Sequence, residues 1–253
     1  MLDHLSYSSI STYQLCPRSW KYRYIDKPRV PTSPALVFGS AFHDAIERAM
    51  IEGEPPAKLW AESWEDQLSD GRNAVIDWGD KSEPEMRELG ARMFAASEVA
   101  AQVATIKPLV IGGEPVIEKR VEMRVPGVPV PIIGYIDVIT EDGVPGDFKT
   151  SARKWNASKA RQETQPIFYL VALNQEGWEH SPDLRFRHYV FTKTKSPAAQ
   201  VFETTRNLNQ MVGLAEIVVG VWKSIEAGAF PCNTTTWKCN PKWCSYYDLC
   251  QGF

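Results

Sequence analysis

The chain has 253 residues, a formal net charge of −3, and 43% hydrophobic and 23% charged residues. This length and apolar content fit one folded domain and exclude a mostly disordered or collagen-like chain. No uninterrupted apolar run approaches the ~18 residues of a membrane span, and the N-terminus lacks the basic and apolar stretches of a secretory signal. We therefore expect a protein of the cytoplasm.

The N-terminal stretch, residues 1–30, is basic, with five lysine or arginine residues against two acids. Its apolar spacing predicts a helix running toward Tyr24, which Pro17 must kink or break. Residues 36–110 then read as a helical region with predicted helices at 36–51, 57–68 and 83–106. Much of this region is acidic, because residues 47–98 hold thirteen acids against six bases.

A change of periodicity marks residues 114–228, where strands and helices alternate. This order predicts a mixed sheet flanked by helices. The predicted strands are 114–125, 130–140, 144–150, 184–193 and 199–205, and the predicted helices are 158–176 and 207–227. The tail, residues 230–253, has little periodicity and needs some other source of order.

Two charged motifs lie on adjacent predicted strands, Gly134-Tyr135-Ile136-Asp137 and Gly146-Asp147-Phe148-Lys149-Thr150. A two-residue turn at Asp142-Gly143 would send the two aspartates to opposite faces of the sheet. A three-residue loop, with Gly143 in the left-handed conformation, would place them directly opposite each other, with Lys149 on the same face. Cooperation between the carboxylates requires this second register.

Carboxylate oxygens that share a face repel each other unless a cation lies between them, and they suit Mg²⁺ or Mn²⁺. The alternative is a surface hairpin with ordinary charges. Residues 149–161 follow directly with five bases and no acid, which fits either a local nucleic-acid groove or a solvated helix face.

Taken together and in this order, the motifs resemble those of the RecB-like branch of the PD-(D/E)XK nucleases, which includes CRISPR-associated and AddB- or RecB-type exonuclease domains. Residues 39–47 (GSAFHDAIE) are similar to its helical G-x-x-x-H-x-x-x-E motif, and residues 165–169 (QPIFY) to its Q-x-x-x-Y motif. Residues 6–17, which end in Cys-Pro, are similar to its N-terminal signature.

This resemblance implies a restriction-endonuclease-like α/β fold, with a mixed central sheet flanked by helices, as one domain over residues 1–253. It also implies roles for individual residues. The implied metal ligands are His43, Asp137, Asp147 and the backbone carbonyl of Phe148. The implied catalytic residues are Asp137, Asp147, Lys149, Gln165 and Tyr169, and Glu47 could assist from one turn beyond His43. For DNA binding we expect Arg153, Lys154, Trp155 and Arg161. Trp155, Trp20 and Tyr22 could stack on bases or belong to the core.

The five cysteines are unevenly placed, with one near the front of the chain and four in the tail. The resemblance implies a [4Fe–4S] cluster that joins the N- and C-terminal segments, since such clusters take four thiolates. Its ligands would be Cys16, Cys239, Cys244 and Cys250, with Cys232 spare or in the place of Cys239. Zinc is the rival, although the paired C-x2-C knuckles of a zinc ribbon are absent. A site without metal is the third reading.

The function that follows is a metal-dependent deoxyribonuclease of bacterial, archaeal or viral origin, an exonuclease acting on single-stranded DNA or DNA ends. A second reading is a nuclease subunit of a recombination, repair or CRISPR-adaptation complex. The chain has no G-x-x-x-x-G-K-[ST] motif, so a partner protein would have to supply helicase activity. A third reading is a DNA-end-binding protein without catalysis.

Overall fold

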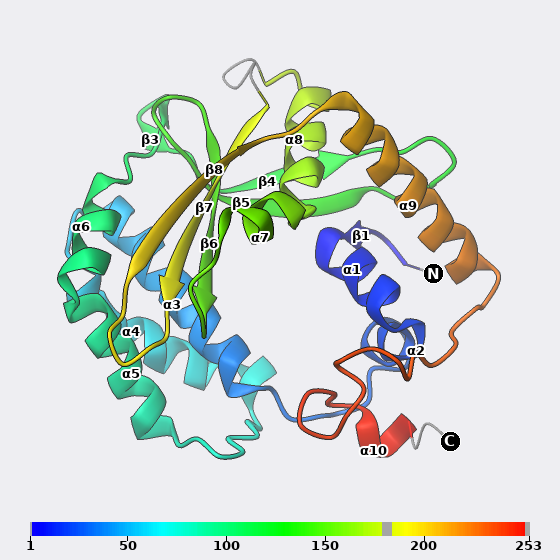
Figure 1. Cartoon of the computed structure of the whole chain (residues 1–253), viewed down its shortest axis with the longest axis horizontal. Coiled ribbons are helices and arrows are strands. Elements are labelled where there is room, and N and C mark those ends of the chain that lie inside the picture. Colours follow the sequence, from blue (N-terminus) through cyan, green and yellow to red (C-terminus); the bar gives the residue numbers. More distant parts are fainter. Residues whose placement is uncertain (1, 179–183, 251–253) are drawn as a thin grey trace.

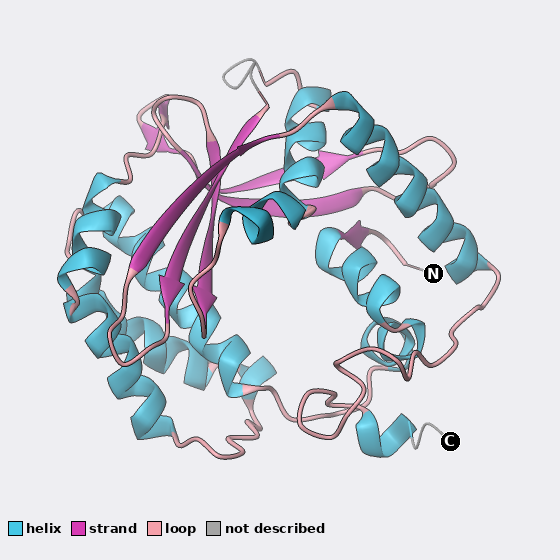
Figure 2. Ribbon diagram, in the orientation of Figure 1, coloured by secondary structure: helices cyan, strands magenta, loops and turns pink. Residues whose placement is uncertain are grey.

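The computed structural model describes residues 2–178 and 184–250. Within these residues, a mixed six-stranded sheet separates two layers of helices (Figures 1 and 2). Its strands are β1 (Leu5–Ser6), β4 (Ile117–Met123), β5 (Ile132–Ile139), β6 (Pro145–Ser151), β7 (Arg185–Thr192) and β8 (Ala199–Thr205). A separate two-stranded ribbon is formed by β2 (Val110–Ile111) and β3 (Glu114–Pro115).

One helical layer, which comes after the N-terminal helices in the chain, packs on one face of the sheet. It contains α3 (Pro34–Glu52), α4 (Pro56–Ser69), α5 (Glu83–Ala95) and α6 (Ser97–Thr105). The other face carries α1 (Tyr7–Leu15), α2 (Pro17–Lys21), α7 (Ala157–Gln162), α8 (Gln165–Gln175) and α9 (Leu208–Glu226). A π-helical turn (Tyr22–Asp26), a 3-10 turn (Gly71–Asn73) and the short α10 (Tyr247–Cys250) complete the described helices.

Two apolar cores lie on the two faces of the sheet. The predicted stripe of Phe38, Phe42 and Ile46 on α3 is fully buried in the first core, together with residues of α4 to α6. Residues of α1, α8 and α9 form the second core. In β5, Ile136 packs into the second core and Val138 into the first, so the strand twists between the two cores at Asp137.

The sheet opens at one edge of β5. Along the other edge, β4 pairs with β5 from Val138 to Ile132. On the open edge, β1 pairs with Ile132 and Ile133, and β6 pairs with Val138 and Ile139. Among the described strands, none pairs with residues 134–137 on this edge. The hydroxyl of Tyr169, on α8, fills part of the gap and donates to the Tyr135 carbonyl over 2.5 Å.

Two helices predicted as continuous are each broken in the structure. The helix expected at 83–106 divides at Ala96, whose extended backbone lets Val99 and Val103 turn into the same core as Met93. The helix expected at 158–176 divides at Glu163, which is also extended. Pro166 then occupies the first turn of α8, where its missing N–H costs no hydrogen bond.

The first predicted helix breaks at Cys16, directly before Pro17, which starts α2. This agrees with the restriction that a proline places on the residue before it. Trp20, which the sequence left open as a base-stacking residue, is wholly buried and stacks on Phe230 at 5.7 Å. Its indole N–H donates to the Ser9 hydroxyl over 2.8 Å. Trp20 is therefore a core residue.

The N-terminal helices and the start of the tail lie side by side (Figure 1). Arg18 donates from its backbone to the Pro231 carbonyl over 3.1 Å and from its side chain to the Phe230 carbonyl over 2.9 Å. The Asn233 side chain donates to the Leu15 carbonyl over 3.0 Å. These contacts bring Cys16 next to the cysteine-rich tail. No described helix has the length and apolar character that crossing a membrane requires.

Candidate active site

The hairpin between β5 and β6 has the register that joint action of its two carboxylates requires. Val138 pairs with Gly146 and Ile139 with Pro145, so the continuation of the ladder sets Asp137 opposite Asp147. Thr140 donates to the Val144 carbonyl over 3.0 Å, which leaves a loop of three residues. Its last residue, Gly143, has a φ of 78°, the left-handed conformation that favours glycine.

The two aspartates lie where β5 and β6 separate, and both are buried. Asp137 Oδ2 accepts a hydrogen bond from the Phe148 backbone N–H at 2.5 Å. This bond takes the place of a ladder bond and fixes the Asp137 carboxylate between the strands. Asp147 Oδ2 is 2.6 Å from the Lys149 ammonium. The predicted pair of carboxylates and the lysine therefore meet at one point of the sheet.

His43 comes to the same point from α3. Its Nδ1 is 3.6 Å from Asp137 Oδ2, and its ring packs edge-on against Phe148 at 5.8 Å. The imidazole also hydrogen-bonds to the backbone of Phe148. Burial lowers the pKa of His43 to about 4, so the ring is neutral at pH 7 and retains a lone pair for a metal.

A group of three side chains has the spacing of a metal site. One ligand atom from each of His43, Glu47 and Asp137 lies within 4.8 Å of the others, the one such group of three among the described residues. Imidazole nitrogen and carboxylate oxygen suit Mn²⁺ and Mg²⁺. Glu47 therefore lies among the candidate metal ligands, whereas the sequence analysis expected it only to assist. Asp147 lies opposite Asp137, with one oxygen engaged by Lys149.

Glu118 is a site residue that the sequence analysis did not select. It stands in β4 between Ile117 and Lys119, whose partners are Val138 and Ile136, and so lies opposite Asp137. Its φ of 47° is strained for a residue other than glycine. The Glu118 side chain hydrogen-bonds to Glu47. Alternating charges along this strand gave a hint, but only the sheet order brings Glu118 to Asp137.

These carboxyl groups hold protons unusually tightly in the absence of a cation. Burial raises the pKa of Asp137 to about 7 and that of Asp147 to about 6. Burial, with the nearby charge of Glu118, raises the pKa of Glu47 to about 9. Lys149 behaves differently: burial alone would lower its pKa, but the carboxylates of Asp147 and Asp137 outweigh it and raise the pKa. Lys149 therefore stays charged.

Gln165 and Tyr169 on α8 hold Lys149 in place. The Lys149 ammonium donates to Gln165 Oε1 over 2.8 Å, and Gln165 Nε2 donates to the Tyr169 hydroxyl over 2.9 Å. Because Gln165 accepts from one neighbour and donates to the other, its amide orientation is fixed. Burial raises the pKa of Tyr169, so the hydroxyl remains protonated. Asp147, Lys149, Gln165 and Tyr169 thus form one continuous chain of contacts, which the sequence analysis did not specify.

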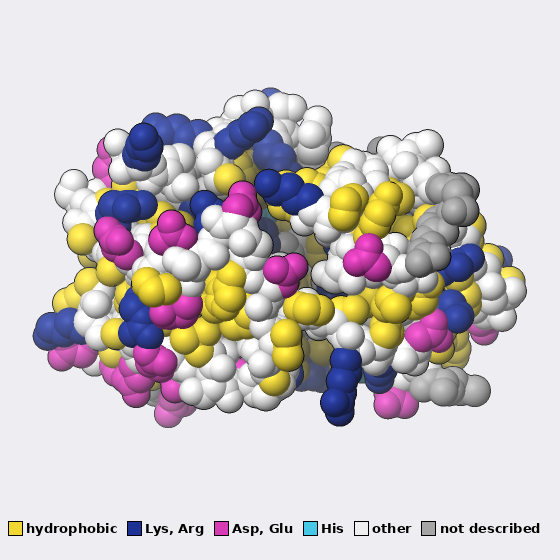
Figure 3. Space-filling view, turned by 90° about the horizontal axis from the view of Figure 1, so that it is seen from below, with side chains coloured by type: hydrophobic (Ala, Val, Ile, Leu, Met, Phe, Trp, Pro, Cys, Tyr) yellow, Lys and Arg dark blue, Asp and Glu magenta, His cyan; other side chains and the backbone are white. Residues whose placement is uncertain are grey.

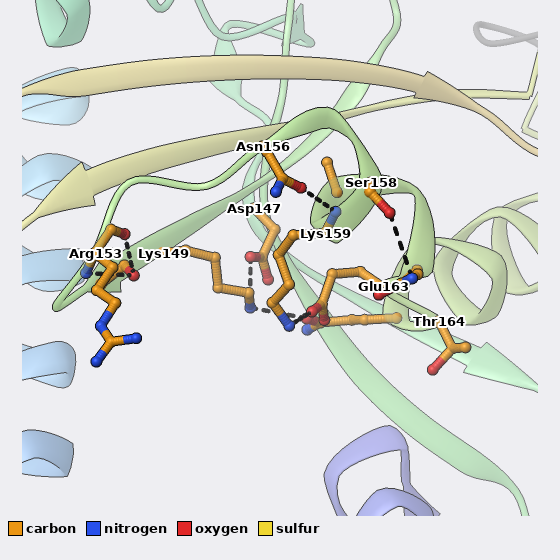
Figure 4. Close-up of polar contacts among 12 residues, drawn as sticks. Asp147, Lys149, Arg153, Asn156, Ser158, Lys159, Glu163 and Thr164 are labelled. Carbon is orange, nitrogen blue, oxygen red and sulfur yellow. Dashed lines mark hydrogen bonds and ion pairs between the residues drawn. The ribbon is translucent and has the colours of Figure 1, made fainter.

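The residues expected to bind DNA do not all lie on one exposed surface. Arg153 and Lys154 are exposed in the loop after β6, and Arg153 points away from Lys149 (Figure 4). Trp155 is half-buried, 5.4 Å from the ring of His188, and its backbone N–H donates to Gln200. Trp155 is thus packed between β7 and α7 and offers little surface to a base.

On α7, Arg161 is exposed and lines a hollow between this helix and β8. Lys159 extends toward the same region as Lys149 and pairs with Glu163 (Figure 4). Lys149 is thus the lysine that contacts a site carboxylate, Asp147, whereas Lys159 pairs with Glu163.

All five cysteines line one cavity of about 190 Å³ between the N-terminal helices and the tail. The Sγ atoms of Cys232 and Cys250 are 3.6 Å apart. Burial, with the thiols of Cys250 and Cys16 beside it, raises the pKa of Cys232 to about 11. In the described part of the chain, no three thiols come within 4.8 Å of one another.

Gly134 sets how closely α8 approaches the site. A Cβ at this position would lie 2.5 Å from the Phe168 ring and 3.0 Å from the Tyr169 ring. We expect Gly134→Ala to lower the free energy of unfolding by about 1–3 kcal/mol, because the helix carrying Gln165 must move. Thermal unfolding measures this.

The matched control is Gly213→Ala on α9, where a Cβ meets nothing within 4 Å. This substitution should stabilise the helix by up to about 1 kcal/mol. Equal melting temperatures for the two variants would contradict the close packing of α8.

Comparison with known proteins identifies the family and supports the fold. The family model described as the PD-(D/E)XK nuclease superfamily matches residues 4–251. Among solved structures, a protein from Eubacterium rectale named "Putative exonuclease" superposes with a TM-score of 0.59 and 14% identity, over 89% of this chain and 82% of that one. At this identity the likeness concerns the fold alone. No curated protein matches the chain significantly.

Proposed function

Since the chain belongs to the PD-(D/E)XK nuclease superfamily, we propose that it is a metal-dependent deoxyribonuclease of the RecB-like branch, an exonuclease acting on single-stranded DNA or DNA ends. The observation that carries this proposal is the register of the hairpin, which sets Asp137 opposite Asp147 with Lys149 beside them. The intact group of charged residues argues against a DNA-end-binding protein without catalysis.

The proposed metal ligands are His43, Glu47 and Asp137, with Asp147 and the Phe148 carbonyl beside them. A divalent cation in this place supplies polarisation of the phosphodiester and a lowered pKa of its bound water. Lys149 places a fixed positive charge where negative charge develops on the phosphate. Gln165 and Tyr169 keep the ammonium in position, so little reorganisation is needed during the reaction.

We expect the affinity for Mn²⁺ to rise about a hundredfold per pH unit between pH 6 and pH 7, because about two protons must leave the carboxyl groups when metal binds. The relevant pKa values are about 9 for Glu47, about 7 for Asp137 and about 6 for Asp147. Calorimetric titration with Mn²⁺ in buffers of different ionisation enthalpy measures both the affinity and the proton release. A pH-independent affinity would contradict the assignment, and Asp137→Asn and Glu47→Gln should each remove about one of the protons released at pH 6.

The raised pKa of Asp137 also makes the metal-free protein less stable as the pH increases. The pKa of Asp137 in the folded protein lies above its ordinary value of 3.8, so the contribution of this group to stability is fully present below pH 3.8. Its contribution is lost as the pH rises through about 7. Stabilisation by Mn²⁺ should therefore be larger at pH 8 than at pH 6.

For the tail we propose a [4Fe–4S] cluster held by Cys16, Cys239, Cys244 and Cys250. The cavity that all five cysteines share supports a common site for four of their thiols. The role of such a cluster would be structural, since the tail has few buried residues of its own and the cavity joins it to the N-terminal helices.

A nuclease assay tests the central proposal. The substrates are single- and double-stranded oligonucleotides, each with a free or blocked 5′ or 3′ end, with Mg²⁺ or Mn²⁺. We expect cleavage that depends on the metal and on a free end. Cleavage in the presence of excess chelator, or none on any substrate with either metal, would overturn it.

A further inference from the structure

The tail exposes two tryptophans although the other large aromatic side chains of the protein are mostly buried. Trp237 is 69% and Trp243 54% exposed, whereas Trp20, Trp60 and Trp64 are at most 2% exposed. Their rings lie 6.1 Å apart at an angle of 71°. The ammonium of Lys242 lies 5.7 Å from the centre of the Trp243 ring. We name Trp237, Lys242 and Trp243 the tail platform.

Asn240 holds the platform in shape. Its side chain donates to the Trp237 carbonyl over 2.8 Å and accepts from the Lys242 backbone N–H over 3.0 Å. Its own carbonyl accepts from the backbone N–H groups of Trp243 and Cys244. The two indoles are therefore presented by a defined turn, which costs less conformational entropy on binding than a flexible loop would.

The chemistry of the platform favours a nucleic-acid strand over a protein partner. Lysine is depleted from protein–protein interfaces, while tryptophan is enriched there. Exposed aromatic rings interleaved with basic residues are typical of proteins that bind single strands, where bases stack on the rings and ammonium groups meet the phosphates. The only acid paired with the platform in the described residues is Asp80, 3.7 Å from Lys242, and both of these side chains are mostly exposed.

The tail lies on a side of the molecule that also carries basic side chains. In Figure 1 the chain runs from α9 down the right side of the view to the tail, which lies at the bottom near α2. Seen from below, the surface is hollowed near its middle, with lysine and arginine side chains in and around the hollow (Figure 3).

We propose that the tail platform is a second binding site for single-stranded DNA, on which unpaired bases stack at Trp237 and Trp243. This inference rests on the proposed nuclease function, since it names the form of DNA that the protein holds. Paired bases in a duplex are already stacked, so the site takes single strands and not blunt duplexes.

The test measures binding without cleavage. In the Asp147→Asn background and without divalent metal, fluorescence anisotropy of a labelled 20-nucleotide oligothymidylate gives the Kd. We expect Trp237→Ala and Trp243→Ala each to weaken binding about tenfold, the order of magnitude for loss of one base–aromatic stack. Blunt duplex binding should change less than twofold. Trp243→Phe, which keeps a stacking face, should restore most of the affinity.

Leu208→Ala on α9 is the matched control, because Leu208 is 72% exposed and lies outside the tail. Its Kd should equal that of the parent. Melting temperature and iron content should be unchanged in the tryptophan variants, which excludes loss of the tail fold as the cause. Equal single-strand affinity of parent and tryptophan variants would overturn the proposal, and so would an equal loss of duplex binding. Absence of cleavage by the wild-type protein would overturn the nuclease proposal alone, since the binding contrast does not depend on cleavage.

Discussion

Asp147→Asn should lower the rate of DNA cleavage by about 10³-fold or more, because the site loses a charge that Lys149 and the metal both require. The substitution preserves the size of the side chain. Lys149 keeps Gln165 as a hydrogen-bond acceptor at 2.8 Å, and it keeps the nearby charge of Asp137. The fold should therefore survive. Single-turnover cleavage of an end-labelled oligonucleotide with Mn²⁺ measures the loss, and circular dichroism checks the fold.

Asp142→Asn is the matched control on the same hairpin. Asp142 forms an ion pair with Arg187 at 2.5 Å in the loop, away from the metal group. The Arg187 guanidinium lowers the pKa of Asp142 to about 2, so this variant should lose some stability at neutral pH and keep its cleavage rate. If Asp147→Asn retained more than a tenth of the parent rate, the catalytic role of Asp147 would be wrong.

Cys16→Ser should remove the iron from anaerobically purified protein and lower its melting temperature by on the order of 10 °C. The parent should be brown, absorb broadly near ~400 nm and hold about four irons per chain. The loss of stability follows because the five-cysteine cavity joins α1 and α2 to the tail, which has little core of its own. Iron analysis and thermal unfolding measure the two effects.

Cys232→Ser separates the ligand sets. Cys232 is the thiol expected to be spare, so this variant should retain its iron, whereas Cys239→Ser should lose it. The reverse result would show that Cys232 is a ligand in place of Cys239. The two outcomes must be distinguished because Cys232 Sγ lies only 3.6 Å from Cys250 Sγ, an expected ligand. Zinc without iron in the parent protein would contradict the cluster altogether.

The sequence allowed two registers for the central hairpin, and the requirement that its two carboxylates act together selected the one that the structure has. The loop of three residues ends at Gly143, and a left-handed glycine in that place fixes which residues of the two strands face each other. Alternation of side chains then places Lys149 with Asp147. The contacts of Gln165 and Tyr169 follow the i, i+4 spacing on one helix.

Glu118 and the helix breaks depend on the tertiary structure, which explains why they were missed. The position of Glu118 opposite Asp137 is defined only when β4 is known to pair with β5. Its left-handed φ of 47° has no signal in a glutamate surrounded by β-forming residues. The break at Ala96 is likewise set by packing of Val99 into the core, since alanine itself favours a continuous helix.

The docking of the N-terminal helices on the last part of the chain also constrains how the protein is made. The contact between Arg18 and Phe230 joins residues 212 positions apart. At roughly 5–20 residues per second, the ribosome takes about 10–40 s to make the intervening chain. During this time Tyr13 and Trp20 have no Phe230 to cover them. The helices that carry Tyr13 and Trp20 are therefore not fully packed until the chain has been made as far as Phe230.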